Sequence, residues 1–399
     1  MALLCLLAPH AFAEDAEDKL SPVNRDLYLE AMQAISEGRK HDASRLLLQM
    51  TASEPKHAGA WLDLALIQCE LGNVEETERL FTEIERRFAP PPEIMQIIQA
   101  RRAIGCHKRT PQMLWNVMLT RGFEQNVNQG TTHSLSPFGE ATYITSDSLP
   151  KADHYLLLSG DLVRDANQNG GMLFAQFQAR RNDYLGQYDS ASIFFGAEQP
   201  LRLGRWTLRG SATAGLQSLG GQLYQKFTQL QVKVAPPLNL PEGLELQLSS
   251  SISHLQYLTL SNFDSNTTEI RGQLQYKKNN AYGSASLALL NDHAIDDRPG
   301  GNRHGWLANL VGRAHLYRNV IGEVGFIHQS WRGQNLFLPN FIDEIRQQRF
   351  QSLRAALVYP WADGQSLQLE MRQVRNRENI PIFQYNNRQI QLSWQWQSR

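Results

Sequence analysis

Residues 389–396 read Gln-Ile-Gln-Leu-Ser-Trp-Gln-Trp, and every second residue in this stretch is apolar. The apolar members are Ile390, Leu392, Trp394 and Trp396, and the residues between them are polar and uncharged. A period of two is the side-chain period of a β-strand, so the pattern predicts a strand with one apolar and one polar face. Because the pattern recurs many times upstream, it predicts a transmembrane β-barrel whose apolar face is covered by lipid.

The same alternation runs through most of the chain after about Trp115. It is seen in residues 227–234, 244–249, 270–277 and 367–372. The polar positions carry charges of both signs, which are costly in a dry core but natural in a wet lumen. We therefore predict an α + β multidomain chain, in which helical repeats precede an antiparallel transmembrane β-barrel of about 14 strands over residues 134–399.

Short and long connections alternate between the predicted strands. Counting back from the C-terminus, the longer stretch Asn376–Tyr385 is followed by the short turn Asp363–Gly364. Bacterial outer-membrane barrels have short periplasmic turns and long external loops, so the last strand is expected to end on the periplasmic side. Under this alternation the window Trp115–Asn126 would run the wrong way. Residues 105–133 are therefore either a linker or a first strand.

The composition places limits on the class of protein. The chain has 399 residues and a formal net charge of zero, which gives no electrostatic reason to expect nucleic acid as a partner. The apolar run Leu3–Leu7 and the motif Ala11–Ala13 predict a signal peptide over residues 1–13. We expect the barrel to lie in the cell outer membrane, in contact with its lipid, and the N-terminal domain to lie in the periplasm.

Residues 24–104 carry an internal repeat. Leu27, Ala31 and Gly38 align with Trp61, Ala65 and Gly72, each at an offset of 34, the period of a tetratricopeptide repeat. The two glycines of this alignment are predicted to lie at the turns between helices. Pro90–Pro92 ends the second repeat, and Glu93–Ile104 is predicted to be a capping helix. An unrelated pair of helical hairpins is the alternative. The tetratricopeptide pattern places five residues on the concave, protein-binding side, although they could instead be inter-helix core. They are Tyr28, Met32, Ile35, Leu62 and Leu66.

Cys69 and Cys106 are the cysteines that remain after the predicted signal peptide. An oxidising periplasm would allow them to form a disulfide. Two unpaired thiols are the other possibility, because sequence spacing does not show proximity.

Two sets of barrel residues are candidates for function. The inward-facing charged residues are expected either to set selectivity and grip a passing chain or to form a structural ion-pair network. They are Arg180, Arg209, Glu245, Arg271, Arg354, Glu370 and Arg372. The tryptophans are expected to form aromatic girdles at the membrane interfaces. They are Trp206, Trp306, Trp331, Trp361, Trp394 and Trp396.

A catalytic role is not expected. His328 and Ser330 would share one face of a strand, as in a membrane hydrolase, but no orienting partner completes a triad in the sequence. The histidines do not have metal-ligand spacing, and no cofactor or metal site is expected.

Two short segments and the domain order together carry a family resemblance. Gly122–Asn128 (GFEQNVN) and Asn379–Asn387 (NIPIFQYNN) resemble segments at the two ends of the barrel in the surface lipoprotein assembly modifier family. The chain departs from the family in its shorter repeat domain and in the three residues after its last aromatic residue.

The resemblance implies a transport role, in which lipoproteins move to the cell surface while the repeat domain engages a lipoprotein cargo or a periplasmic chaperone. The alternatives are an exopolysaccharide export porin with a periplasmic repeat scaffold and, less favoured, an outer-membrane hydrolase. Export barrels for charged glycans typically favour a lumen of one sign, whereas the predicted lumen charges are mixed.

Overall fold

The computed structural model describes residues 22–106, 112–132, 146–203, 206–238, 240–278 and 281–398. The predicted signal peptide lies outside these residues, and so does the start of the first predicted strand window at Ser134. The chain divides into two compact units. One contains the helices together with Asp165–Met172, and the other contains the strands.

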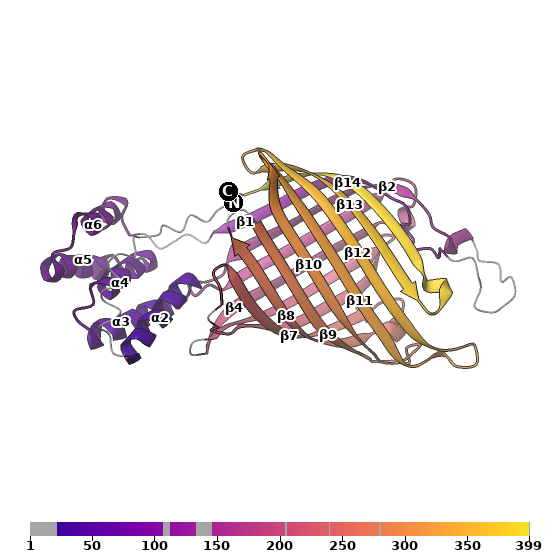
Figure 1. The fold of residues 1–399 in the computed structure, drawn as a ribbon, viewed down its shortest axis with the longest axis horizontal. Coiled ribbons are helices and arrows are strands. Elements are labelled where there is room, and N and C mark those ends of the chain that lie inside the picture. The colour runs from indigo at the N-terminus through magenta and orange to yellow at the C-terminus, as the bar shows by residue number, and fades with distance from the viewer. Residues whose placement is uncertain are drawn as a thin grey trace. The chain divides into compact units, whose positions relative to one another are not determined.

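Five helices make up residues 22–104 of the first unit (Figure 1). They are α2 (Pro22–Ser36), α3 (Lys40–Ser53), α4 (Ala58–Leu71), α5 (Val74–Phe88) and α6 (Pro92–Ile104). Gly38 and Gly72 have φ angles of +73° and +82° at the turns before α3 and α5, a conformation that glycine adopts without steric cost. The predicted helix pairs and turn glycines are therefore present, whereas the tetratricopeptide class stays a prediction. None of the described helices is long and apolar enough to cross a membrane.

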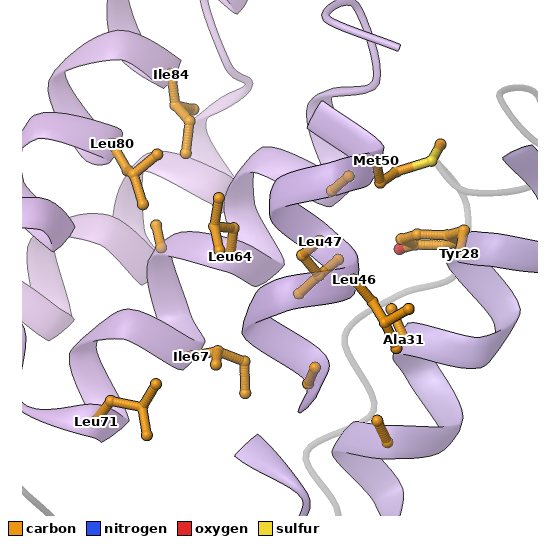
Figure 2. Packing of buried hydrophobic residues seen from close by; sticks show 14 of the residues in the cluster. Tyr28, Ala31, Leu46, Leu47, Met50, Leu64, Ile67, Leu71, Leu80 and Ile84 are labelled. Carbon is orange, nitrogen blue, oxygen red and sulfur yellow. The ribbon is translucent and has the colours of Figure 1, made fainter. Parts of the chain in front are cut away.

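The core of this unit forms where the helices approach closely (Figure 2). Ala31 on α2 and Ala65 on α4 are fully buried, and their small side chains leave room for the neighbouring helix. Leu47, Leu64 and Leu80 bring α3, α4 and α5 into the same cluster. The alanines at the repeat offset are thus packing residues.

A disulfide joins Cys69 at the end of α4 to Cys106 after α6. Of the two possibilities for these cysteines, the disulfide is confirmed. The bond ties the segment after α6 back to α4, across a sequence separation of 37 residues.

We predict that Cys69→Ser/Cys106→Ser destabilises the helical unit by about 4 kcal/mol, the loop-closure entropy expected for a loop of this length. Hydrogen exchange of α4 and α6 in the full-length protein measures this loss as faster amide exchange. The barrel strands of the same sample serve as the internal control. Unchanged protection of the α4 and α6 amides against exchange would show that packing alone holds α6 in place.

The second unit is a closed antiparallel barrel of fourteen strands. In chain order they are β1 (Met113–Glu124), β2 (Asp153–Asp165), β3 (Met172–Asn182), β4 (Ser190–Leu203), β5 (Trp206–Leu219), β6 (Gln222–Ala235), β7 (Leu244–Tyr257), β8 (Ser265–Lys278), β9 (Ala281–Ala294), β10 (Arg303–Tyr317), β11 (Val320–Leu338), β12 (Ile342–Ala362), β13 (Gln365–Glu378) and β14 (Tyr385–Gln397). The predicted fold class and strand number are confirmed.

The barrel begins earlier than the predicted boundary at Ser134. Of the two possibilities for residues 105–133, the segment contains the first strand, because Met113–Glu124 pairs with β14 on one side and β2 on the other. The direction of this window fits the barrel, since β1 runs antiparallel to both β14 and β2.

The two rims of the barrel differ in their connections. The rim where β1 begins and β14 ends, here called the terminal rim, carries turns such as Arg318–Asn319 and Asp363–Gly364. The opposite rim, here called the far rim, carries the 125–152 connection and the loop 295–302. The turns of the terminal rim are not uniformly the shorter ones, because β5 and β6 meet at the far rim with only Gly220 and Gly221 between them.

The exposed fractions of the side chains identify the two faces of the wall. On β14, Leu392 is 55% exposed whereas its neighbour Ser393 is 1% exposed. The same alternation on β9 leaves Leu287 and Leu289 exposed and Ala288 buried. An outer face of isolated apolar side chains is the surface that a bilayer covers, and the alternate residues line the interior.

Candidate functional site: the lumen wall at the strand seam

β1 and β14 meet at the seam, the junction of the barrel wall that no turn connects. Their register runs from Asn116 opposite Gln397 to Glu124 opposite Gln389, which is nine residue pairs. β1 makes twelve such pairs with β2. On the inner face of the seam, the hydroxyls of Thr120 and Ser393 lie 2.8 Å apart, and both residues are buried.

Glu124 is the polar centre of the far-rim end of the seam. Its carboxylate accepts hydrogen bonds from Asn387 Nδ2 at 2.5 Å and Gln389 Nε2 at 3.1 Å, both on β14. It also forms an ion pair with Arg180 on β3. One carboxylate therefore joins three strands, and its two oxygens are satisfied by charged and amide donors.

Tyr155 on β2 also links strands on either side of β1. Its ring lies over Gly122, where an added Cβ would overlap the ring. The Tyr155 hydroxyl donates to Gln391 Oε1 on β14 at 2.7 Å, and the Arg180 guanidinium lies 4.0 Å from the ring centroid. The seam cluster is the set that these contacts join. It consists of Gly122, Glu124, Tyr155, Arg180, Asn387, Gln389 and Gln391.

We predict that Gly122→Val displaces Tyr155 and destabilises the barrel by about 2 kcal/mol, the usual cost of overpacking a filled site. Urea unfolding of the detergent-solubilised protein measures the change. The matched control is Gly325→Val, because a Cβ at Gly325, also on the inner face, meets nothing closer than 3.8 Å. Equal loss in the two variants would contradict a special role for the Gly122 position.

A second charge network lines the wall of β10 to β13. Arg354 binds Glu370 at 2.5 Å and Glu323 at 3.1 Å, and Arg372 binds Glu370 at 2.9 Å. Arg313 approaches Glu323 at 3.5 Å. Two carboxylates thus bind three guanidinium groups, and this network spans the four neighbouring strands β10 to β13.

The remaining predicted lumen charges lie on other parts of the wall. Glu198 holds Arg209 at 3.2 Å and the Lys233 ammonium at 2.7 Å. Arg271 pairs with Glu269 at 2.6 Å. Glu245 lies opposite Gln275 on β8. The structure therefore brings all five predicted arginines next to carboxylates, but it distributes them around the wall and does not gather them into one site.

The acidic partners Glu124, Glu198, Glu269 and Glu323 were not predicted from the sequence. Their strand positions have the polar parity, which is the signal that could have found them. A further inner-face charge group sits near the far rim, where buried Asp292 binds Arg298 at 2.8 Å and Arg303 at 2.6 Å. Among the described residues, no group of three His, Cys, Asp or Glu side chains could hold a metal ion.

The predicted tryptophans lie near both rims, and all but Trp331 lie on the outer face of the barrel. Trp206, Trp306, Trp361 and Trp394 are exposed on the outer face, and Trp396 packs 4.2 Å from Trp394. Trp331 does not belong to this girdle. It pairs with Gly305 in the row of inward positions, and Arg303 lies 4.6 Å above its ring.

His328 and Ser330 share the outer face of β11. His328 stacks on Trp306 at 4.6 Å, and its Nδ1 lies 3.2 Å from Gln351 Nε2. Ser330 lies opposite Trp306 in the register. The imidazole of His328 thus has Trp306 and Gln351 as neighbours. The absence of enzymatic activity remains a prediction.

The predicted groove residues of the helical unit lie in or against its core. Tyr28 is 8% exposed, whereas Met32, Ile35, Leu62 and Leu66 are partly buried against the core cluster. The Tyr28 hydroxyl donates to Asp63 at 2.8 Å. Burial raises the pKa of the Asp63 carboxyl, and the Tyr28 hydrogen bond opposes that rise. A binding role for these residues stays a prediction.

The two segments that carry the family resemblance meet at the far-rim end of the seam. The backbone N–H of Asn126 donates to Asn387 Oδ1 at 3.1 Å, and Asn126 Nδ2 donates to the Asn386 carbonyl at 3.0 Å. The Thr132 N–H donates to the Gln384 carbonyl at 3.0 Å. Segments about 260 residues apart are therefore joined by hydrogen bonds through buried asparagines.

Comparisons with known proteins show no family for this chain. No family model matches the chain, and no curated protein matches its sequence. The outer-membrane channel DcaP of Acinetobacter baumannii aligns with a TM-score of 0.42 and 9% identity, over 72% of this chain and 97% of that one. An anion-selective porin from Comamonas acidovorans aligns with a TM-score of 0.38 and 9% identity, over 72% and 99% of the two chains. CdiB from Acinetobacter baumannii aligns with a TM-score of 0.41 and 9% identity, over 71% and 60%. Likeness at this level carries no conclusion about activity.

Proposed function

We propose that the protein is an outer-membrane transport protein that helps lipoproteins reach the cell surface, with its helical unit in the periplasm engaging the cargo or a chaperone. A closed barrel with exposed leucines on its outer face and charges inside supports a membrane location. Outer-membrane barrels carry short turns in the periplasm and longer loops outside, which assigns the far rim, with its loop 295–302, to the cell-surface side.

The observation that carries the proposal is the seam. The segments that resemble the lipoprotein assembly family, Gly122–Asn128 and Asn379–Asn387, come together there. The seam is also the junction that lacks a connecting turn and has fewer residue pairs than β1–β2. It is therefore the part of the wall that can open without breaking the chain.

A lipid-modified cargo needs such an opening for a physical reason. Its acyl chains are apolar, whereas the inner wall presents ion pairs such as Arg354–Glu370. Placing the acyl chains in that lumen would separate them from lipid and leave polar groups without water. A seam that opens sideways would let the acyl chains stay in the bilayer while the protein part crosses.

The lumen charges disfavour export of a charged polysaccharide. The described wall arginines named above each lie beside a carboxylate, so the lumen does not offer a field of one sign to a polyanion or polycation. Polysaccharide export remains the competing proposal and is tested by the same experiment.

A disulfide across the seam tests the lateral route. Thr120→Cys/Ser393→Cys places thiols on facing residues of β1 and β14 whose hydroxyls are 2.8 Å apart. The variant is expressed in a strain that lacks the gene, and protease shaving of intact cells measures surface-exposed lipoprotein. We expect oxidation to reduce exposure to the level of the deletion strain, and a reductant to restore it.

The control is Gln231→Cys/Ser251→Cys, which joins facing inner residues of β6 and β7 and leaves the seam free. This variant should support normal exposure in both redox states. Full lipoprotein exposure with a locked seam would contradict the lateral route. Loss of secreted polysaccharide in the deletion strain, with lipoprotein exposure unchanged, would instead assign the barrel to polysaccharide export.

A further inference from the structure

A cavity of about 860 Å³ lies at the far rim beside the seam. Its walls come from β13, β14, the loop before β14 and the described residues that flank β1 and β2, such as Gln125 and Pro150. The residues that line it include Gln125, Asn126, Pro150, Gln373, Arg375, Arg377, Asn386 and Arg388. The volume is that of a small-molecule site, larger than a single inorganic anion requires.

Three arginines give the cavity its charge. Arg375, Arg377 and Arg388 are exposed, and the lining residues include no Asp or Glu. Among the described residues, none of these three guanidinium groups lies within ion-pair distance of a carboxylate, in contrast to the lumen arginines. Arg375 lies 3.2 Å from the side-chain amide of Gln373. The cavity therefore presents positive charge that the described part of the chain leaves uncompensated.

The strand register places these arginines on the outer face of the wall. Gln373 pairs with Arg388 and Arg375 pairs with Asn386, in the same alternate row as Met371 and Ile390. Met371 is 60% exposed and lies on the apolar outer face. The buried Glu370 and Asn376 occupy the other row and face the interior. The arginines thus continue the lipid-facing row past the end of its apolar part.

This arrangement fits an amphiphile with an anionic head group. Guanidinium groups bind phosphate through charge-assisted, bidentate hydrogen bonds, and side-chain amides suit sugar hydroxyls. The apolar row that begins at Met371 and Ile390 gives the acyl chains of the same molecule a surface to lie on. A free anion would use the arginines and leave most of the cavity and this apolar surface unused.

We propose that the cavity binds the phosphorylated sugar head group of a membrane glycolipid, with its acyl chains along β13 and β14. The inference rests on the barrel being in a membrane, and it does not depend on the identity of the cargo. A lipid bound here would lie beside the seam, since Gln125 and Asn126 line the cavity and both donate hydrogen bonds to β14.

Native mass spectrometry of the full-length protein in detergent, with diphosphorylated lipid A as the probe, tests the proposal. Arg375→Gln/Arg377→Gln/Arg388→Gln is expected to weaken binding roughly 100-fold, because three charge-assisted donor groups are lost. The control is Lys277→Gln/Lys278→Gln/Arg318→Gln, which removes the same charge from exposed residues at the terminal rim. This control should bind the probe like the unaltered protein.

Two measurements on the unaltered protein do not depend on how any variant folds. Fully dephosphorylated lipid A should bind at least tenfold more weakly than the diphosphorylated form, and millimolar inorganic phosphate should not displace the lipid. Equal binding of the two lipids, displacement by free phosphate, unchanged binding by the arginine variant, or equal loss in both charge variants would each overturn the proposal.

Discussion

The pairing of β1 with β14 is the constraint on which the barrel depends. A sheet has two edges whose N–H and C=O groups need partners, and in a membrane such groups have no water to bind. Closure satisfies both edges at once, and here it rests on nine residue pairs between segments at opposite ends of the barrel sequence. The even number of strands follows from this requirement, because every neighbouring pair in a closed antiparallel barrel must run in opposite directions.

Closure also gives a role to the polar side chains at the seam. No turn fixes the register of β1 against β14, so side-chain contacts have to do so. Glu124 binds two residues of β14 and one arginine of β3, and Tyr155 reaches from β2 over Gly122 to Gln391. These contacts bridge more than two strands. A slip of one residue would turn Glu124 toward lipid, at a large cost in free energy.

The sequence predicted the features that depend on local pattern. Alternation identified the strands and their lipid-facing residues, and repeat spacing identified Gly38 and Gly72 as turn residues. Features that depend on pairing between distant segments could not be predicted from the sequence. Neither the partner of Arg180 nor the inward position of Trp331 follows from one strand alone, because each depends on the register of its neighbours. The choice between a linker and a first strand for residues 105–133 stayed open for the same reason, since a strand is identified by its partner and β14 lies about 270 residues away.

The account makes the seam the route by which an acylated cargo meets the membrane. Photo-crosslinking from an unnatural residue at Leu119 on β1 or Leu392 on β14 tests this directly, because both face outward beside the junction. Leu230 and Leu289, which face outward on the distant strands β6 and β9, are the reference positions. The account predicts that lipoprotein in transit crosslinks to Leu119 and Leu392 and not to Leu230 or Leu289. Equal crosslinking at all four positions, or crosslinking confined to inner residues such as Ser251, would contradict it.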